Sequence, residues 1–257
     1  MSDKNLYDYP RYYDLVFGSD WKAEYDFLLA CFNALAKRRV QRVFEPACGT
    51  GRLLYRLAKA GYDVSGLDLN RRAVEYCNRR LERHGLAATA AVGDMSRFRL
   101  KRKVDAAFNM INSFRHLTTA EAALGHMQCM AAALAKGGLY VLGLHLLPTV
   151  GRPMDEESWS ARRGHLCVNT HMWTISRNRR CREERLRMNY DVYTPTQSFR
   201  IADDIVFRTY TLKQFRELVD SVPQLEIAAV YDFAYRFDQP LTPRATTEDA
   251  VFVLRKL

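Results

Sequence analysis

The sequence predicts an α/β protein built on a doubly wound, mostly parallel sheet of seven strands, with an antiparallel β insertion. Two observations predict it. From residue 40 onward, short apolar strands alternate with amphipathic helices, and after Pro148 this alternation gives way to segments in which every second residue is apolar. Alternating strands and helices are typical of parallel sheets. A period of two is typical of antiparallel sheets that are covered on one face.

The elements of the parallel part follow one another at short spacing. The region Tyr7–Ala36 is predicted to be helical and is rich in aromatic residues. Glycine adopts the left-handed conformation that ends helices, so we expect helix ends at Gly85 and at Gly137–Gly138. The predicted strands are 40–45, 62–67, 87–92, 104–110, 139–146, 225–232 and 250–254, and the predicted helices are 51–60, 71–84, 118–136 and 212–221.

The insertion contains three strands of period two, which are Leu166–Ser176, Glu184–Tyr193 and Phe199–Arg208. Their turns are expected at 177–180 and 194–197. An antiparallel insertion between two parts of one α/β domain predicts a lid over a site. The predicted organisation is therefore an N-terminal helical cap (1–38), a binding domain (39–148 and 209–257) and a lid (149–208).

Composition indicates an ordinary globular chain of 257 residues, 48% hydrophobic and 26% charged. The longest apolar stretch, Gly138–Val150, is shorter than the ~20 residues that span a bilayer, so it predicts a buried strand and no membrane association. Six cysteines at irregular spacing, without an export signal, predict free thiols and a cytoplasmic location. His165, Cys167, His171 and Cys181 do not follow a known zinc spacing, so no metal site is predicted.

Carboxylates follow three successive strands. Glu45 belongs to the segment Val43–Gly51, a strand followed by a glycine-containing loop and a helix. Asp68 ends the next strand, at a spacing suited to an acid that accepts hydrogen bonds from ribose hydroxyls. Asp94 follows the third strand. Open α/β sheets bind ligands at the carboxyl ends of their strands, which is where all three acids should lie.

These residues permit two other interpretations. A dinucleotide-binding motif requires a third glycine where this chain has Leu54, and Glu45 would be repelled by a pyrophosphate. The second interpretation is a glycine-rich turn with solvated acids, which binds no ligand. The charge of Glu45 favours a cofactor that combines ribose and adenine with a cationic amino-acid end.

Glu45-Pro-Ala-Cys-Gly-Thr-Gly51 resembles the first motif of class I S-adenosylmethionine-dependent methyltransferases, and Gly66-Leu-Asp68 and Gly93-Asp94-Met95 resemble the second and third. The resemblance implies a Rossmann-like fold and S-adenosyl-L-methionine as cofactor. It implies that Glu45, Ala47 and Gly49 hold the methionine portion, Asp68 the ribose, and Asp94 with Met95 the adenine. The full set of implied cofactor residues is Tyr12, Glu45, Ala47, Gly49, Gly51, Asp68, Leu69, Asp94, Met95, Asn109 and Ile111.

Among members of that class, the chain resembles small-molecule N-methyltransferases, namely amino-sugar N,N-dimethyltransferases and glycine N-methyltransferase-like enzymes. The likeness runs from Tyr12–Leu15 through Gly93–Phe98 into Asn112–Leu117. After Pro148 only the layout agrees. The implied activity is methyl transfer to nitrogen or oxygen of a small-molecule acceptor.

Two residues are candidates for the chemistry. His116 is placed by the resemblance near the methyl group, as a base or as an orienting residue; the alternative is a surface histidine. Tyr13, with Tyr12, could cover the sulfonium by a cation–π contact, or pack as part of an amphipathic helix. Arg115 stands where the family has a small residue, and could face either an anionic substrate group or solvent.

Net charge of +10 keeps a second class open, an RNA or protein methyltransferase. Asn109-Met110-Ile111-Asn112 lacks the Pro-Pro-aromatic signature used on base nitrogens, which argues against a nucleic-acid substrate. A third possibility is a non-catalytic protein that senses the cofactor. Six arginines in Ser176–Arg187 surround a predicted turn, where a solvated role is favoured over an anion site. The lid sheet could also pair between subunits of a homodimer.

Overall fold

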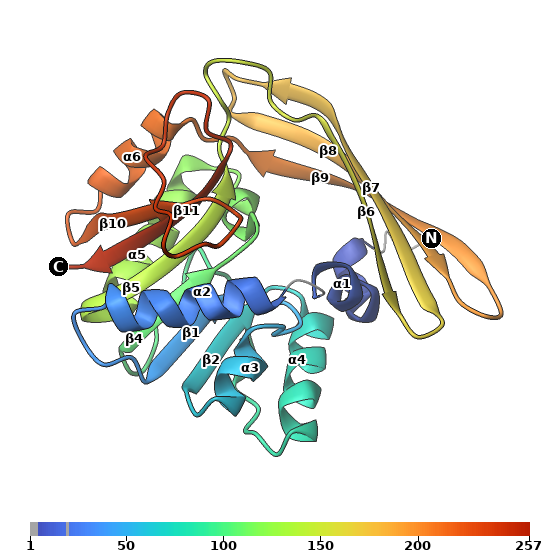
Figure 1. Ribbon diagram of the computed structural model, residues 1–257, viewed down its shortest axis with the longest axis horizontal. Coiled ribbons are helices and arrows are strands. Elements are labelled where there is room, and N and C mark those ends of the chain that lie inside the picture. The colour runs from blue at the N-terminus through green and yellow to red at the C-terminus, as the bar shows by residue number, and fades with distance from the viewer. Residues whose placement is uncertain (1–4, 19–20) are drawn as a thin grey trace.

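The computed structural model describes residues 5–18 and 21–257, and within these residues the chain forms a seven-stranded and a four-stranded sheet (Figure 1). The larger sheet is built from the segments predicted to form it. Its strands are β1 (Arg42–Pro46), β2 (Asp63–Asp68), β3 (Ala90–Val92), β4 (Val104–Asn109), β5 (Leu134–His145), β10 (Leu225–Tyr231) and β11 (Asp249–Lys256).

The larger sheet has the order β10-β11-β5-β4-β1-β2-β3, and β11 runs antiparallel to both of its neighbours. The remaining neighbours pair in parallel. The order reverses between β1 and β4, and a crevice opens beyond the carboxyl ends of strands at such a switch point. The predicted Rossmann-like doubly wound sheet is confirmed.

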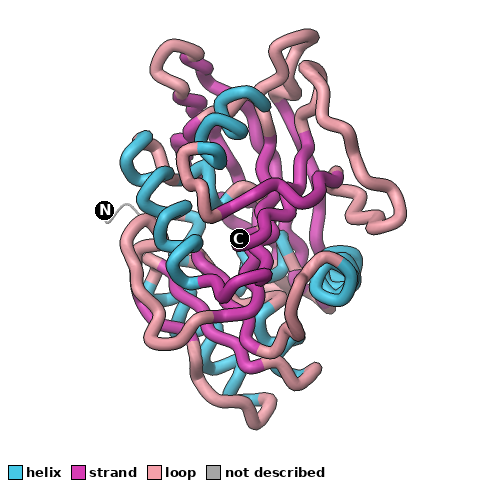
Figure 2. Tube along the Cα trace, turned by 90° about the vertical axis from the view of Figure 1, so that its left-hand side faces the viewer, coloured by secondary structure: helices cyan, strands magenta, loops and turns pink. Residues whose placement is uncertain are grey.

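Helices cover both faces of this sheet (Figure 2). The alternation within β5 shows why: Val141 packs into one hydrophobic cluster and Leu142 into the other. Polar caps begin the helices at 71–83 and 120–133, since the Asn70 and Thr119 side chains accept hydrogen bonds from the backbone of the first turn. On one face lie α2 (Trp21–Ala34), α3 (Leu54–Lys59) and α4 (Arg71–Arg83), and on the other α5 (Ala120–Ala133) and α6 (Leu212–Asp220).

The smaller sheet is the predicted insertion and is antiparallel throughout. Leu186, Met188 and Tyr190 are buried on one face of β8 (Glu183–Tyr193), as their alternation predicts. They form a third hydrophobic cluster with residues of α1 (Pro10–Phe17), which lies beside these strands in Figure 1. The strands are β6 (Glu156–Arg163), β7 (Leu166–Asn178), β8 (Glu183–Tyr193) and β9 (Ser198–Arg208).

The N-terminal segment packs against the smaller sheet. The 3-10 helix η1 (Leu6–Asp8) precedes α1, and the backbone N–H of Leu6 donates to Asp203 Oδ2 of β9 at 3.0 Å. The helical prediction for 7–36 therefore divides into η1, α1 and α2, and its residues 19–20 lie outside the described part of the chain.

Several predicted boundaries were wrong. The helix predicted to end at Gly137 ends at Ala133, because Leu134 already pairs with Val104 and the two glycines fall in a register shift of β5. The strand predicted over 87–92 is only Ala90–Val92, and the helix predicted from Gly51 begins at Leu54. Strand β6 was missed because half of its residues are charged and most of them are exposed.

Candidate cofactor and acceptor site

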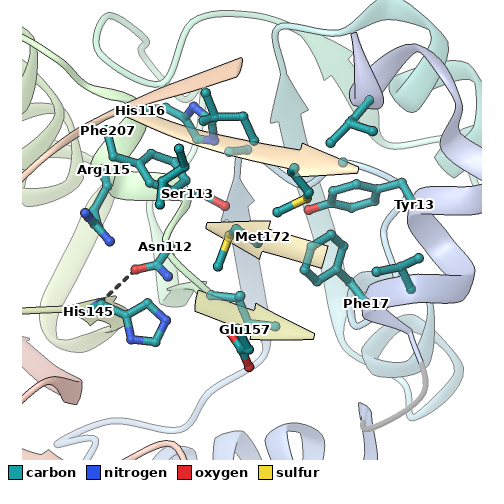
Figure 3. A pocket seen from close by; sticks show the side chains of 18 of the residues that line it. Tyr13, Phe17, Asn112, Ser113, Arg115, His116, His145, Glu157, Met172 and Phe207 are labelled. Atoms are coloured by element: carbon teal, nitrogen blue, oxygen red, sulfur yellow. Dashed lines mark hydrogen bonds between the residues drawn. The ribbon is translucent and has the colours of Figure 1, made fainter. Parts of the chain in front are cut away.

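A cavity of about 1150 Å³ lies between the carboxyl ends of β1, β2 and β4 and the inner face of the smaller sheet. This volume is at the upper limit of ordinary small-molecule sites, so it can hold two ligands side by side. Figure 3 shows Tyr13 and Phe17 from α1 on one wall and Arg115, His116 and Phe207 on the opposite wall. Helix α1, the main sheet and the smaller sheet therefore all line one cavity.

The loop after β1 turns in left-handed steps. Ala47, Gly49 and Gly51 have φ values of 54°, 52° and 65°. Gly49 lies on the cavity wall, where an added Cβ would stand 3.7 Å from the Tyr13 ring. At Gly51 an added Cβ would stand 2.3 Å from Cys77 Sγ, so this glycine permits close packing of the loop on α4. Gly51 thus lies behind the cavity and not on its wall.

Asp68 at the end of β2 connects two loops. Its Oδ2 accepts from Gly49 N and its Oδ1 from Asn70 N, both at 2.8 Å. Burial raises the pKa of Asp68, although these two amides oppose that shift. Each carboxylate oxygen keeps a second lone pair, so the group remains able to accept from two ligand hydroxyls. The neighbouring Leu69 is 71% exposed and lines the cavity, offering an apolar surface to a flat ring.

Two buried oxygen atoms behind the first loop have no hydrogen-bond partner among the described residues, Glu45 Oε2 and Asn109 Oδ1. Asn109 donates instead to Pro46 O at 2.8 Å. Burial raises the pKa of Glu45 well above its usual range, while the nearby Arg52 lowers it. Buried acceptors that lack donors are costly, so a cationic ligand group beside them would be favourable.

The third predicted acid lies further out. Asp94 is exposed and its Oδ1 accepts from Ser96 N at 2.7 Å, whereas its neighbours Gly93 and Met95 line the cavity. Behind Met95, the buried His126 donates from Nδ1 to Met95 O at 2.9 Å and accepts from the Tyr140 hydroxyl at 2.7 Å. This interaction holds the backbone of Met95 in place.

The chain after β4 is strained. Ile111 and Asn112 both have left-handed backbones, with φ values of 51° and 63°. For a β-branched residue this conformation costs roughly 1–3 kcal/mol. It is held because Asn112 N donates to Gly143 O at 3.1 Å, and Asn112 Oδ1 accepts from His145 N at 2.7 Å (Figure 3). Strain of this kind concentrates at functional sites.

The two tyrosines of α1 point in different directions. Tyr13 faces the cavity, and burial raises its pKa to about 12, so its hydroxyl keeps its proton. Tyr12 lies off the cavity wall and packs on Phe199 of the lid, with ring centroids 5.7 Å apart. The helical turn of about 100° per residue separates the two rings. The prediction that Tyr12 contacts the cofactor is therefore not supported, and packing explains Tyr12.

His116 lies on the cavity wall and meets a residue that the sequence did not single out. The Tyr7 hydroxyl and His116 Nε2 are 2.8 Å apart, and the Phe207 ring packs edge-on at 4.8 Å. The surrounding protein, together with the charge of Arg115, lowers the pKa of His116 to about 4. The side chain is open to the cavity yet neutral at physiological pH.

Arg115 corrects both earlier interpretations, because it faces neither solvent nor a free anion site. It is 5% exposed, pairs with Glu184 of β8 and donates from Nε to Arg208 O at 3.2 Å. Arg177 pairs with the same Glu184 and with Asp155. The arginine cluster is therefore only partly solvated, and its member on the cavity wall is already neutralised.

Of the predicted site residues, eight line the cavity, namely Tyr13, Ala47, Gly49, Asp68, Leu69, Met95, Ile111 and His116. Five do not, namely Tyr12, Glu45, Gly51, Asp94 and Asn109. The residues that sequence reasoning missed come mostly from the lid and the N-terminal segment, such as Trp159, Met172 and Tyr7. Their only sequence signal was aromatic or apolar character, which the hydrophobic core shares.

The donors and acceptors fit S-adenosylmethionine. A carboxylate at the end of β2, an exposed apolar side chain beside it, and buried acceptors behind the loop suit ribose, adenine and an ammonium group respectively. Within 5–18 and 21–257, no group of three or more His, Cys, Asp or Glu side chains could hold a metal ion. No helix in the same ranges is long and apolar enough to cross a membrane.

Residues 43–138 match a family model described as a methyltransferase domain. Residues 43–138 are therefore similar to methyltransferase domains, and the strand order and loop geometry are those of the class I S-adenosylmethionine-dependent methyltransferase fold, as the motifs predict.

Two of the similar proteins are named as methyltransferases of amino sugars. The chain is 30% identical over 138 residues to dTDP-3-amino-3,4,6-trideoxy-alpha-D-glucopyranose N,N-dimethyltransferase from Streptomyces venezuelae, an alignment that spans 52% of this chain and 56% of that relative, about half of each. The structure of DesVI from Streptomyces venezuelae matches with a TM-score of 0.79 at 20% identity, covering 97% of both chains. CalS10, an amino pentose methyltransferase from Micromonospora echinaspora, matches with a TM-score of 0.74 at 22% identity, covering 99% of both.

Proposed function

We propose that this protein transfers a methyl group from S-adenosylmethionine to an amino nitrogen of a small, sugar-like acceptor. The observation that carries the proposal is one cavity lined both by the three strand-end loops and by the inner face of the lid. The names of the similar proteins support an amino-sugar acceptor, since two of them are an amino-sugar and an amino-pentose methyltransferase.

The cofactor occupies the half of the cavity formed by the main sheet. Asp68 accepts from the ribose hydroxyls, Leu69 and Met95 contact the adenine, and Ala47 with Gly49 contacts the methionine portion. From behind the loop, the unpaired oxygens of Glu45 and Asn109 and the charge of Glu45 attract the ammonium group of the methionine portion. Tyr13, which packs over Gly49, closes this half from the side of α1.

The acceptor occupies the half beneath the lid. Bound S-adenosylmethionine supplies a methyl group that its sulfonium has already activated, so the chain mainly aligns the acceptor nitrogen and excludes water. His116 and Tyr7 form a neutral donor–acceptor pair that orients the acceptor. Trp159, Met172 and Phe207 form the apolar walls around it.

The division into a cap, a binding domain and a lid is part of this proposal. The homodimer and the cytoplasmic location stay predictions. An RNA substrate is disfavoured, because the arginines that line the cavity in the described ranges, Arg115 and Arg177, are both paired with Glu184.

Calorimetry with S-adenosylhomocysteine and a panel of amino sugars tests the proposal. Wild-type protein should bind S-adenosylhomocysteine and, with S-adenosylmethionine, add methyl groups that mass spectrometry detects on the amine. Asp68→Ala should weaken cofactor binding on the order of 10- to 100-fold, because a charged hydrogen-bond acceptor is lost. Asp63→Ala, at the exposed other end of β2, is the control and should bind normally. Absence of cofactor binding by the wild type would contradict the proposal.

A further inference from the structure

A histidine–carboxylate pair stands on the cavity wall apart from the cofactor residues. His145 ends β5, and its Nδ1 lies 2.6 Å from Oδ1 of Asp249, the first residue of β11. Both residues line the cavity, with 27% of the His145 side chain and 42% of the Asp249 side chain exposed. The pair is therefore reachable by a ligand and is held between two strands of the main sheet.

The position of His145 is set from three sides. Its backbone N–H donates to Asn112 Oδ1, as the dashed line in Figure 3 marks. Its ring packs on Phe233 with centroids 5.0 Å apart, and Asp249 holds one ring nitrogen. The strained Asn112 thus connects the segment after β4, expected near the methyl group, directly to the residue that carries the imidazole.

The pair also selects a tautomer. An ionised carboxylate only accepts hydrogen bonds, so Nδ1 of His145 carries the proton and Nε2 presents a lone pair. Within residues 5–18 and 21–257, Nε2 of His145 makes no hydrogen bond. His116 differs, since its Nε2 is already engaged by the Tyr7 hydroxyl. A carboxylate that orients an imidazole in this way is a common arrangement for a base.

We propose that His145, oriented by Asp249, is the base that removes a proton from the ammonium form of the acceptor. The inference rests on the proposed function. One N–H bond of the ammonium breaks and its proton moves to Nε2, which leaves a lone pair on the acceptor nitrogen. The nitrogen lone pair then forms the bond to the methyl carbon while the carbon–sulfur bond breaks and its electrons return to sulfur. His116 keeps the orienting role.

The charges around the pair suit this step. Glu248 and Glu157 line the same cavity, from the residue before β11 and from β6. Asp155 is paired with Arg177, and Arg115 with Glu184, so neither arginine opposes a cation there. The carboxylates favour both an incoming ammonium and the imidazolium that forms.

A nitrogen-15 spectrum of histidine-labelled protein loaded with S-adenosylhomocysteine tests the geometry at pH 8.5. The His145 ring, identified by its loss in His145→Gln, should show a protonated Nδ1 and an unprotonated Nε2. Asp249→Asn should shift this balance toward protonated Nε2. A wild-type ring with its proton on Nε2 would overturn the inference.

Rates measured on the amino-sugar panel from pH 6.5 to 9.5 test the role. His145→Gln should lower kcat roughly 100-fold or more at pH 7. The loss should shrink as pH rises and free amine forms, while binding of S-adenosylhomocysteine stays unchanged. His171→Gln, which removes an exposed His–Glu pair of the lid, is the matched control. If the wild type is active and His145→Gln has the same pH–rate profile, only the role of His145 as base is overturned. Wild type that methylates no amine overturns the proposed function.

Discussion

At the scale of single residues, the site depends on carboxylates held in unequal surroundings. Asp68 is held by two backbone amides, Glu184 by two arginines, and Glu45 is buried with one oxygen unpaired. Burial alone would raise the pKa of Glu184, but Arg115 and Arg177 outweigh it and lower the pKa. In Glu45 burial wins, and its pKa is raised. At Glu45, unlike at Glu184, the charge of the nearby arginine, Arg52, does not outweigh burial.

This difference predicts that cofactor binding releases a proton. Because its pKa is raised, Glu45 in the free protein keeps its proton to a higher pH than an ordinary glutamate does. A ligand ammonium beside it favours the carboxylate and lowers that pKa, so affinity for S-adenosylhomocysteine should rise with pH through the raised value.

Calorimetry in buffers of different ionisation enthalpy measures this release directly. Glu45→Gln should abolish it, whereas Glu75→Gln, on the exposed surface of α4, should not. Equal proton release by the wild type and Glu45→Gln would show that another group is responsible.

At the scale of elements, α5 carries a buried polar interaction under the third motif. His126 is fully buried and bridges Met95 O and the Tyr140 hydroxyl. Burial lowers its pKa to about 4. Helix α5 thereby holds the backbone of Met95, which lines the cavity, through the neutral ring of His126.

The stability of the fold should therefore decrease in mild acid. The unfolded chain binds a proton at His126 near pH 6.5, and the folded chain only near pH 4. The contribution of His126 to the free energy of unfolding is fully present above pH 6.5. It decreases by about 3 kcal/mol as the pH falls to about 4. Urea unfolding at pH 7.5, 5.5 and 4.5 measures it.

His126→Gln should flatten that dependence while lowering stability at pH 7.5. His165→Gln, an exposed histidine of the lid, should leave the slope unchanged. A slope that persists in His126→Gln would assign the effect to other groups, of which His116 is the first to test because its pKa is also lowered to about 4.

At the scale of the whole molecule, the site is shared between parts that lie far apart in sequence. The main sheet supplies the loops at 47–51, 68–69 and 93–95, and the lid supplies the opposite wall through β6, β7 and β8. The N-terminal segment contacts both, through Tyr13 over Gly49 and Leu6 on Asp203. In the proposed function, the cofactor and the acceptor therefore face different parts of the chain.

Hydrogen exchange should separate the two halves. S-adenosylhomocysteine alone should slow exchange at residues 47–51 and 68–70, because these amides line or support the cofactor half. The hairpin at 194–197, at the far end of the lid, should not change. Equal slowing throughout the lid would contradict the division into a cofactor half and an acceptor half.

The sequence alone was enough to predict the strand–helix alternation, the three strand-end motifs and the period-two insertion, because each is a local pattern in which neighbouring side chains share one environment. It therefore predicted the sheet, the lid and eight of the residues on the cavity wall.

The contacts between side chains that are far apart in sequence could be seen only in the folded protein. Arg115 contacts Glu184, Tyr7 contacts His116, and His145 contacts Asp249, at separations of 69, 109 and 104 residues. No local periodicity records such pairs, since each partner alone resembles an ordinary surface or core residue. The direction of a ring on a helix, which separates Tyr13 from Tyr12, was likewise settled by packing against the lid.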